Sequence, residues 1–221
     1  MSKKIRIIVV DDHPFFRHGV VQWINQQSDL TCCGEADSIA QAKAVVASLT
    51  PDVILLDLQL KDGDGLDLTM ALSQEYPAVR IVILSHRDEA VYAHRALRAG
   101  ARAYIMKSEG TELVKAAIQA VMKGEIYVSR PVAARALQKL LPDPGSSEFQ
   151  LDRLSDREVQ VFQLLGAACG TRDIAALLKI SPKTVETYRE NLKHKLHLAD
   201  AEALVRAAKN WVEHGKLDPS K

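Results

Sequence analysis

The sequence predicts an α/β protein, a doubly wound five-stranded parallel sheet, with a second, all-α domain behind it. Short apolar runs alternate five times with amphipathic helical patterns between residues 5 and 122. Several of these runs lack polar alternation, which is typical of strands buried on both faces of a parallel sheet. After a stretch rich in proline, glycine and serine, four helical patterns follow one another within residues 151–214.

Composition limits the classes of protein to consider. The chain has 221 residues, of which 47% are hydrophobic and 26% charged, and this suits one large or two smaller packed domains. The net charge of +1 does not by itself indicate a nucleic-acid-binding protein. We expect a cytoplasmic protein without a membrane segment, because no secretory signal pattern is present and no apolar run approaches about 18 residues.

The three cysteines are Cys32, Cys33 and Cys169. They have no metal-ligand spacing and cannot all pair. We interpret Cys32 and Cys33 as core residues in a reducing compartment, and a redox sensor is the alternative.

The apolar patterns place each element of the first domain. In chain order, we expect strands at residues 4–10, 30–36, 53–56, 80–84 and 101–106, with helices at 14–27, 38–49, 66–75, 88–99 and 111–122. Pro14 suits a first helical turn, Ser38 a helix N-cap, and Gly100 the residue after a helix.

Acidic residues follow two of the expected strands. Asp57 ends the strand at 53–56, and Asp11 and Asp12 end the strand at 4–10. The carboxyl ends of neighbouring strands form the functional edge of an open α/β sheet. Carboxylates that lie close together raise one another's pKa unless a cation intervenes, and an all-oxygen site suits Mg²⁺. The alternatives are that Asp11 and Asp12 cap the following helix and that Asp57 is a turn residue.

A hydroxyl and an ammonium group are expected at the same edge. Ser85 follows the strand at 80–84, and Lys107 follows the strand at 101–106. Together with the acids, this set could bind Mg²⁺, use one carboxylate as a nucleophile towards phosphoryl groups, and neutralise the product. A generic surface lysine is the alternative for Lys107.

The remaining chain divides into a linker and a helical domain. The linker is expected to hold an extended stretch at 124–129, a short helix at 133–141 and the flexible composition Pro142–Ser147. Helices are expected at about 155–168, 172–178, 182–196 and 201–213. The second and third of these, joined by a short turn, are typical of a helix-turn-helix. We therefore predict an α/β domain at 1–123, a linker with a short helix at 124–149 and a helical domain at 150–221.

These motifs resemble a known family. The order Asp11-Asp12, Asp57, Ser85, Tyr104, Lys107 resembles the receiver domain of two-component response regulators. The stretches 154–158, 173–175, 180–185 and 195–196 resemble the LuxR-type DNA-binding domain. Nearly the whole chain thus resembles a NarL/FixJ-type transcription factor, and the resemblance implies a flavodoxin-like strand order 2-1-3-4-5.

The resemblance implies a role for each residue of the first domain's site. Asp57 would accept a phosphoryl group from a sensor histidine kinase. The implied Mg²⁺ ligands are Asp11, Asp12, Asp57 and the backbone carbonyl of Gln59. Lys107 would pair with the phosphoryl oxygens, Ser85 would move towards them, and Tyr104 would turn inward into the vacated space. An ordinary core-edge tyrosine is the alternative for Tyr104.

The resemblance also implies that the helix after Ser181 enters the major groove of DNA. The candidate DNA contacts, matched by position, are Lys183, Thr184, Glu186, Thr187, Arg189, Glu190 and Lys193. Arg189 is best suited to read guanine, and Lys183, Thr184 and Lys193 suit phosphates. The alternative for the charged residues is a solvated helix surface.

Two apolar sets complete the expectations for the helical domain. Val185, Leu192 and Leu196 should face its core. In the last helix, Leu204, Val205, Ala208 and Trp211 are expected either at a dimer surface, as the resemblance implies, or in the core.

Two positions depart from the family pattern. Lys61 stands in the loop after Asp57 where a proline is usual, and His86 stands where a small residue is usual. Our hypothesis is that His86 and Gln59 alter water access and thereby phosphoryl lifetime. The alternative for His86 is a solvated loop residue.

The expected function is therefore a DNA-binding response regulator, not an enzyme, that controls transcription through dimerisation. Its expected partners are a sensor histidine kinase, double-stranded DNA and a second copy of the chain when phosphorylated, with RNA polymerase as a further candidate. One alternative is a regulator of the same fold switched by a ligand or partner, which the complete acidic site disfavours. Another is an aspartyl-phosphate type of phosphatase, which would leave the helix-turn-helix unexplained.

Overall fold

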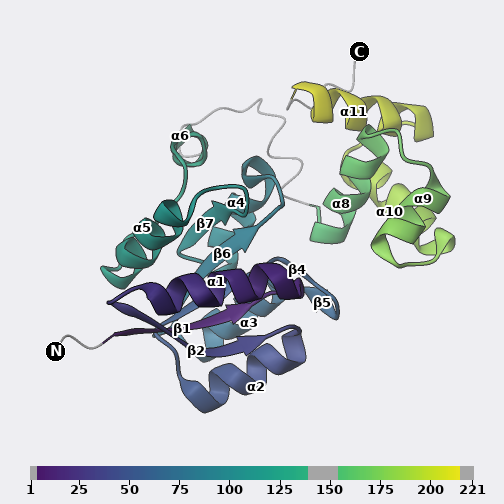
Figure 1. Ribbon diagram of the computed structural model, residues 1–221. Coiled ribbons are helices and arrows are strands. Elements are labelled where there is room, and N and C mark those ends of the chain that lie inside the picture. The colour runs from purple at the N-terminus through teal and green to yellow at the C-terminus, as the bar shows by residue number, and fades with distance from the viewer. Residues whose placement is uncertain (1–3, 139–153, 215–221) are drawn as a thin grey trace. The chain divides into compact units, whose positions relative to one another are not determined.

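A computed structural model of the chain describes residues 4–138 and 154–214 (Figure 1). The chain divides into two units, residues 1–141 and 142–221, each described by itself below. The flexible composition at 142–147 lies outside the described residues, and the domain boundaries predicted at 123 and 149 stay predictions. None of the described helices is long and apolar enough to cross a membrane.

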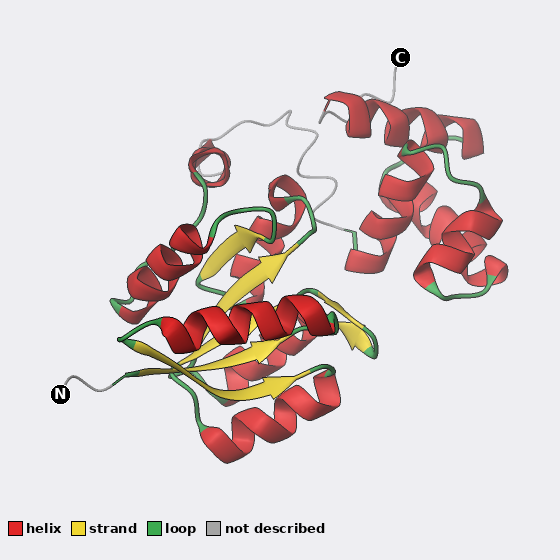
Figure 2. Ribbon diagram, viewed as in Figure 1, coloured by secondary structure: helices red, strands yellow, loops and turns green. Residues whose placement is uncertain are grey.

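A five-stranded parallel sheet forms the centre of the first unit (Figure 2). Its strands are β1 (Ile5–Val10), β2 (Leu30–Ala36), β3 (Val53–Leu56), β6 (Arg80–Ser85) and β7 (Ala103–Met106). Their order is β2-β1-β3-β6-β7, and every neighbouring pair is parallel. The predicted doubly wound sheet and its 2-1-3-4-5 order are confirmed.

Helices cover both faces of this sheet (Figure 1). They are α1 (Pro14–Gln26), α2 (Ile39–Leu49), α3 (Gly65–Glu75), α4 (Glu89–Ala99) and α5 (Thr111–Met122). The β7 strand begins two residues later than predicted, because the Ala101 N–H still donates to the Ala96 carbonyl at the end of α4.

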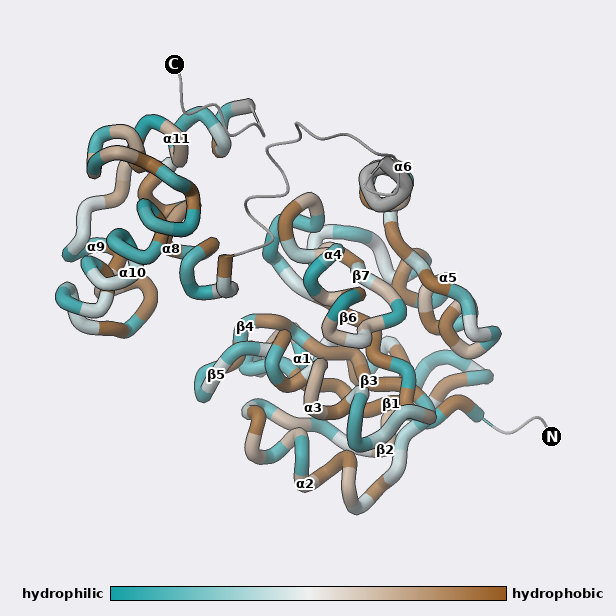
Figure 3. The backbone as a smooth tube through the Cα atoms, turned by 180° about the vertical axis from the view of Figure 1, so that it is seen from behind, coloured by the Kyte–Doolittle hydropathy of each residue, from teal (hydrophilic) through white to brown (hydrophobic). Residues whose placement is uncertain are grey.

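Because helices cover both faces of the sheet, the strand sequences do not alternate between apolar and polar residues. Ile7 and Val9 join the core cluster that Ile24 and Ile118 complete from α1 and α5. The intervening Ile8, pointing to the other face, is equally buried. Figure 3 shows β1 and β3 as predominantly hydrophobic stretches. Burial of each such side chain contributes roughly 1.5–3 kcal/mol, so a polar residue on either face would be costly.

The start of α2 differs from the expectation. Ser38 occupies the N-cap position, but its side chain makes no capping hydrogen bond. Instead, the Asp62 carboxylate accepts from the N–H groups of Ile39 at 2.8 Å and Ala40 at 3.2 Å. Asp62 lies in the turn of a short hairpin, β4 (Gln59–Leu60) and β5 (Gly63–Asp64), that follows Asp57.

The segment after α5 lies against the edge of the sheet. The Tyr127 carbonyl accepts from the Tyr104 N–H at 3.1 Å, and the Tyr127 N–H donates to the Arg102 carbonyl at 2.9 Å. The Ser129 hydroxyl donates to the Glu89 carboxylate in α4 at 2.8 Å. The next helix, α6 (Arg130–Gln138), begins three residues earlier than predicted.

Four helices form the described part of the second unit: α8 (Asp156–Gly166), α9 (Thr171–Leu178), α10 (Pro182–Lys195) and α11 (Ala201–His214). The predicted helix-turn-helix is the α9–α10 pair, with Lys179 in the left-handed conformation between them. Val185, Leu192 and Leu196 are buried, as predicted.

The last helix decides between the two interpretations, dimer surface or core, for two of its residues. Leu204 and Ala208 are 0% exposed within the domain, so they belong to its core. Trp211 packs on Phe162 with ring centroids 5.9 Å apart. Val205 is 39% exposed and remains accessible to a partner.

Cys32, Cys33 and Cys169 are only half-buried and form no disulfide. The interpretation of Cys32 and Cys33 as core residues is therefore only partly right. Burial raises the pKa of Cys32 to about 11, which keeps this thiol protonated and disfavours a redox role for it.

An ion pair between the partly exposed Lys195 and the buried Glu158 joins α10 to α8. Glu158, whose side chain is 3% exposed, accepts from Lys195 Nζ at 2.7 Å and from the Ser155 N–H at 2.6 Å. Burial alone would raise the pKa of Glu158, but the hydrogen bonds from Lys195 and Ser155 outweigh it and lower this pKa below its usual range.

We predict that Glu158→Gln lowers the free energy of unfolding of the second unit by about 1–3 kcal/mol. Because the folded-state pKa of Glu158 is depressed, its contribution is present above pH 4.5 and is lost as the pH falls through the folded-state pKa. Urea unfolding of the full chain in a Trp23→Phe background, followed by Trp211 emission, measures this.

Glu190→Gln is the matched control, since Glu190 pairs with Lys193 at the exposed surface. Its expected effect is under about 0.5 kcal/mol. Equal losses in the two variants, or a Glu158→Gln loss that persists unchanged at low pH, would contradict this account.

Candidate functional site

Strand register brings the acids and the lysine together at the carboxyl edge of the sheet. Val10 pairs with Leu56, so the next residues, Asp11 and Asp57, lie side by side. On the other side of β3, the Lys107 N–H donates to the Ser85 carbonyl at 2.8 Å. The structure thus assembles groups that are far apart in the sequence.

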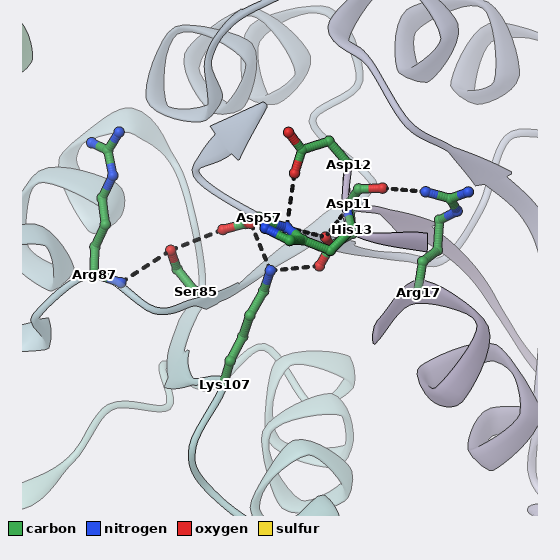
Figure 4. A network of polar contacts seen from close by, with 8 residues as sticks. All are labelled: Asp11, Asp12, His13, Arg17, Asp57, Ser85, Arg87 and Lys107. Atoms are coloured by element: carbon green, nitrogen blue, oxygen red, sulfur yellow. Dashed lines mark hydrogen bonds and ion pairs between the residues drawn. The ribbon is translucent and has the colours of Figure 1, made fainter. Parts of the chain in front are cut away.

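Lys107 forms two ion pairs at the centre of the site (Figure 4). Its Nζ lies 2.6 Å from Asp57 Oδ2 and 2.7 Å from Asp11 Oδ2. All three side chains are buried, at 0–3% exposed. With Asp12 nearby, three carboxylates face one ammonium group, so the site retains an excess of negative charge that favours a further cation.

The acidic cluster has the donor atoms that Mg²⁺ requires. One ligand atom each from Asp11, Asp12, Asp57 and His13 lies within 4.8 Å of the others. Asp12 Oδ1 is buried and makes no hydrogen bond among the described residues, although His13 Nδ1 lies 2.9 Å away. A buried oxygen without a hydrogen-bond partner, beside two other carboxylates, fits a metal ligand. Gln59 lies in β4 with an exposed side chain.

Asp11 also helps to cap α1, as the alternative interpretation of this residue expected. Its Oδ1 accepts from the His13 N–H at 2.8 Å, at the start of α1. The Arg17 guanidinium donates to the Asp11 backbone carbonyl at 2.5 Å. The two interpretations are compatible, because the other Asp11 oxygen pairs with Lys107. His13 and Arg17 had not been singled out from the sequence.

Ser85 contacts Asp57 directly, and Tyr104 is hydrogen-bonded to the loop that follows Ser85. The Ser85 hydroxyl donates to Asp57 Oδ1 at 2.9 Å. Tyr104 is 1% exposed, and its hydroxyl donates to the Arg87 carbonyl at 2.8 Å. Burial raises the pKa of Tyr104, so its hydroxyl remains a hydrogen-bond donor. In this structure the Tyr104 ring already points inward.

Arg87 is a site neighbour that sequence reasoning missed. Its guanidinium lies over the Tyr92 ring, 4.7 Å from the ring centroid, and 3.8 Å from Asp64 Oδ2. Its N–H lies 3.4 Å from the Ser85 hydroxyl oxygen. Arg87 therefore connects the Ser85 loop to α4 and to the hairpin after Asp57.

Gly65 allows the chain after Asp57 to pass close to the strand. A Cβ at this position would lie 2.5 Å from the Asp57 carbonyl oxygen and 2.6 Å from Leu58 Cα. Both are backbone atoms that cannot move without shifting Asp57 itself. A glycine is required here by close approach.

The two departures from the family pattern have different surroundings. The Lys61 ammonium is paired with Asp37 at 2.7 Å. His86 is exposed, and its ring centroid is 6.5 Å from that of Phe16. The proposed effect of His86 and Gln59 on phosphoryl lifetime stays a hypothesis.

On α10, the candidate DNA-contacting helix, some of the candidate residues are exposed and others are partly covered. Lys183, Glu186, Thr187 and Glu190 are exposed, whereas Thr184, Arg189 and Lys193 are partly covered. The Lys193 ammonium pairs with Glu190 at 2.9 Å. Thr184 bonds to the Ser181 side chain that caps the helix.

Arg189 is held against the preceding helix. Its guanidinium donates to the Thr171 hydroxyl at 2.9 Å and lies 3.6 Å from the Glu186 carboxylate. Thr171 in turn donates to Glu186 at 2.7 Å. Thr171, on α9, had not been identified from the sequence.

Known proteins combine these two units. Residues 7–119 match the response regulator receiver domain, and residues 152–208 match the luxR family of bacterial regulatory proteins. The chain is 33% identical over 217 residues to response regulator GacA of Pseudomonas viridiflava, covering 98% of this chain and 99% of GacA. It is 32% identical over 209 residues to the oxygen regulatory protein NreC of Staphylococcus haemolyticus, covering 92% and 96%.

The structure of RcsB from Salmonella enterica serovar Typhimurium has a similar fold. The TM-score is 0.60 at 22% identity, covering 93% of this chain and 99% of RcsB.

A receiver fold joined to a helix-turn-helix domain defines a DNA-binding regulator of transcription. The chain belongs to the two-component response regulators, in the NarL/FixJ group that carries a LuxR-type DNA-binding domain.

We predict that Asp12→Asn weakens Mg²⁺ binding to the full chain at least about tenfold, because it removes one of three negative charges and a candidate ligand. Isothermal titration calorimetry measures the affinity without any phosphoryl donor. Glu75→Gln, which removes an exposed carboxylate at the far end of α3, is the control and should bind Mg²⁺ like the wild type. Equal affinity of Asp12→Asn and the wild type would contradict this assignment.

Proposed function

We propose that Asp57 accepts a phosphoryl group from a sensor histidine kinase and that the phosphorylated receiver controls dimerisation and DNA binding. One observation carries the proposal. A single buried carboxylate has one oxygen paired with the Lys107 ammonium and the other with the Ser85 hydroxyl. This arrangement positions a nucleophile and, beside it, two donors suited to phosphoryl oxygens.

The proposed step conserves atoms and charge. A carboxylate oxygen of Asp57 attacks phosphorus, the phosphorus–nitrogen bond of the kinase phosphohistidine breaks, and the imidazole leaves with the electron pair. Lys107 and Ser85 then donate to the phosphoryl oxygens in place of Asp57. Mg²⁺, held by Asp11, Asp12, Asp57 and the Gln59 backbone carbonyl, would supply positive charge against those oxygens.

The contacts behind Asp57 offer a path to the rest of the domain. If Ser85 follows the phosphoryl group, the loop that carries Arg87 moves with it. The Arg87 carbonyl holds the Tyr104 hydroxyl, and the Tyr104 N–H holds the segment after α5 through Tyr127. We therefore expect phosphorylation to change both the α4–β7 surface and the start of the linker.

The second unit is proposed to bind double-stranded DNA through α10. Lys183, Thr184, Thr187 and Lys193 are the candidate backbone contacts, and Arg189 is the candidate base reader. RcsB has been solved bound to a promoter in the presence of a phosphomimetic, and this supports DNA binding by the phosphorylated form here. The small surplus of positive charge on α10 favours binding as a homodimer on paired half-sites. RNA polymerase would be a downstream partner in the cytoplasm.

Enzymatic turnover is the less favoured function. Members of this family are DNA-binding transcription regulators and not typically enzymes. A phosphatase would have no use for α9 and α10, whereas a phosphorylation-switched regulator uses both units.

We predict that acetyl phosphate with Mg²⁺ adds one phosphoryl group to the wild type and none to Asp57→Asn, as seen by mass spectrometry of the intact protein. Light scattering should then show a monomer-to-dimer shift in the wild type alone. Asp67→Asn, which removes an exposed acid near the start of α3, is the control and should behave like the wild type. Incorporation into Asp57→Asn, or none into the wild type, would contradict the proposed acceptor.

We predict that Lys183→Ala weakens DNA binding about equally for all sequences and reduces the slope of log affinity against log salt by about 1. Arg189→Ala should instead reduce discrimination between sequences. Fluorescence anisotropy with labelled duplexes at several salt concentrations measures both effects. Lys209→Ala, an exposed cation on α11, should leave the slope unchanged. A slope change in Lys209→Ala but not in Lys183→Ala would place the DNA surface elsewhere.

A further inference from the structure

The turn of the β4–β5 hairpin lies against the start of α2. This turn consists of Lys61 and Asp62 and is called the hairpin turn below. The Asp62 carboxylate accepts from the N–H groups of Ile39 and Ala40, which lie 23 and 22 residues earlier in the chain. A Cβ at Gly63 would lie 2.6 Å from Ile39 Cδ1, so the hairpin also packs closely on α2. Hydrogen bonds and packing therefore join the hairpin turn to this helix.

Capping of α2 does not by itself explain this contact. The helix has a serine, Ser38, at its N-cap, where the capping side chain is ordinarily found. The Ser38 side chain makes no capping hydrogen bond, and Asp62 supplies the acceptor from a distant part of the chain. Both Asp62 oxygens are engaged, one on each N–H group, so the contact fixes the hairpin turn as well as the helix end.

The hairpin has few other restraints. Each of its strands has only two residues, and an isolated two-stranded hairpin is marginally stable. Lys61 stands where the family usually has a proline, whose ring would fix the backbone angle φ of the turn. The ion pair between Lys61 and Asp37 joins side chains that are 52% and 42% exposed, and such pairs contribute little. Among the described residues, Asp62 therefore provides the strongest restraint on the hairpin turn.

The hairpin turn is close in the chain to Gln59, whose backbone carbonyl is proposed to bind Mg²⁺. Gln59 begins β4 and pairs with Asp64 in β5. At the base of the hairpin, the carbonyl of the buried Leu58 accepts from the Gly65 N–H at 2.9 Å. At the tip, Asp62 holds the turn on α2. The backbone of Gln59 lies between these two fixed points, so its position depends on both.

We propose that Asp62 is a positioning residue for Mg²⁺ binding: it ties the hairpin turn to α2 and thereby holds the Gln59 carbonyl where it can serve as a ligand. Asp62 is not itself a ligand, because both of its oxygens accept from α2. Removal of a group that holds a metal ligand in place typically weakens metal binding by roughly 10- to 100-fold. This role of Asp62 rests on the proposed function, in which the Gln59 carbonyl binds Mg²⁺.

The first test is calorimetric titration of the full, unphosphorylated chain with Mg²⁺. Asp62→Ala should weaken Mg²⁺ binding about tenfold. Asp62→Asn should stay within about threefold of the wild type, because asparagine caps a helix as well as aspartate does, although it lacks the charge. The two variants thus separate the hydrogen bonds from the negative charge. Asp37→Asn, which removes the exposed partner of Lys61, is the control and should also stay within about threefold.

A double variant tests the restraint on the turn directly. In the Asp62→Ala background, Lys61→Pro returns the proline that is usual in the family and limits the turn through its fixed φ. The backbone accepts this change, because Lys61 has no positive φ and the preceding Leu60 lies in a strand. The double variant should recover Mg²⁺ affinity to within about threefold of the wild type, since proline suits this position of a turn.

The Mg²⁺ dependence of phosphorylation separates positioning from damage to the acceptor. Asp62→Ala should need about tenfold more Mg²⁺ for half-maximal reaction with acetyl phosphate, yet reach the wild-type extent of labelling at saturating Mg²⁺. A residue that only capped α2 would lower the urea midpoint of unfolding and leave the Mg²⁺ affinity unchanged.

Unchanged Mg²⁺ affinity in Asp62→Ala, an equal loss in Asp62→Asn or Asp37→Asn, or no recovery in the double variant would overturn the proposal. If Asp12→Asn weakens Mg²⁺ binding while Asp62→Ala does not, the role of Asp62 fails and the proposed metal site stands. If the wild type binds no Mg²⁺, both fail together.

Discussion

The buried bridge from Lys107 to Asp57 and Asp11 is the constraint on which the receiver depends. An ammonium group without its carboxylates would be costly at 0% exposure, and the carboxylates would repel one another without it. The bridge therefore fixes the ends of β1, β3 and β7 relative to one another. It also leaves negative charge uncompensated, because Asp12 adds a third carboxylate. The same cluster of charges thus stabilises the domain and favours the binding of a cation.

Around this bridge, hydrogen bonds connect the proposed acceptor Asp57 to the loop after Ser85. Ser85 occupies the second oxygen of Asp57, and the loop after Ser85 holds the buried Tyr104 hydroxyl. The strand that carries Tyr104 is also hydrogen-bonded to the segment leading to α6. Rearrangement at one carboxylate would therefore be transmitted through packed, hydrogen-bonded elements. In the second unit, Arg189 of α10 is restrained by its hydrogen bond to Thr171 on α9.

The sheet and the acceptor site could be predicted from the sequence because both follow from strand ends. A continuous apolar run that stops at Asp57 gives the strand, its burial and the place of the acid together. Contacts between residues that are far apart in the sequence could not be predicted in this way. Asp62 replaces Ser38 as the cap of α2 because a hairpin brings it there. Arg189 meets Thr171 only through the crossing of two helices. Leu204 has the same apolar character whether it lies in a core or at a dimer surface, so only packing distinguishes the two.

The central claim is that phosphorylation of Asp57 controls DNA binding by α10. The most direct measurement is the affinity of the full chain for a duplex selected from a random pool, before and after treatment with acetyl phosphate and Mg²⁺. The account predicts a gain of roughly 5- to 150-fold for the wild type, the usual range of coupling between two sites, and no gain for Asp57→Asn. Unchanged affinity of a fully phosphorylated wild type, or an equal gain in Asp57→Asn, would contradict it.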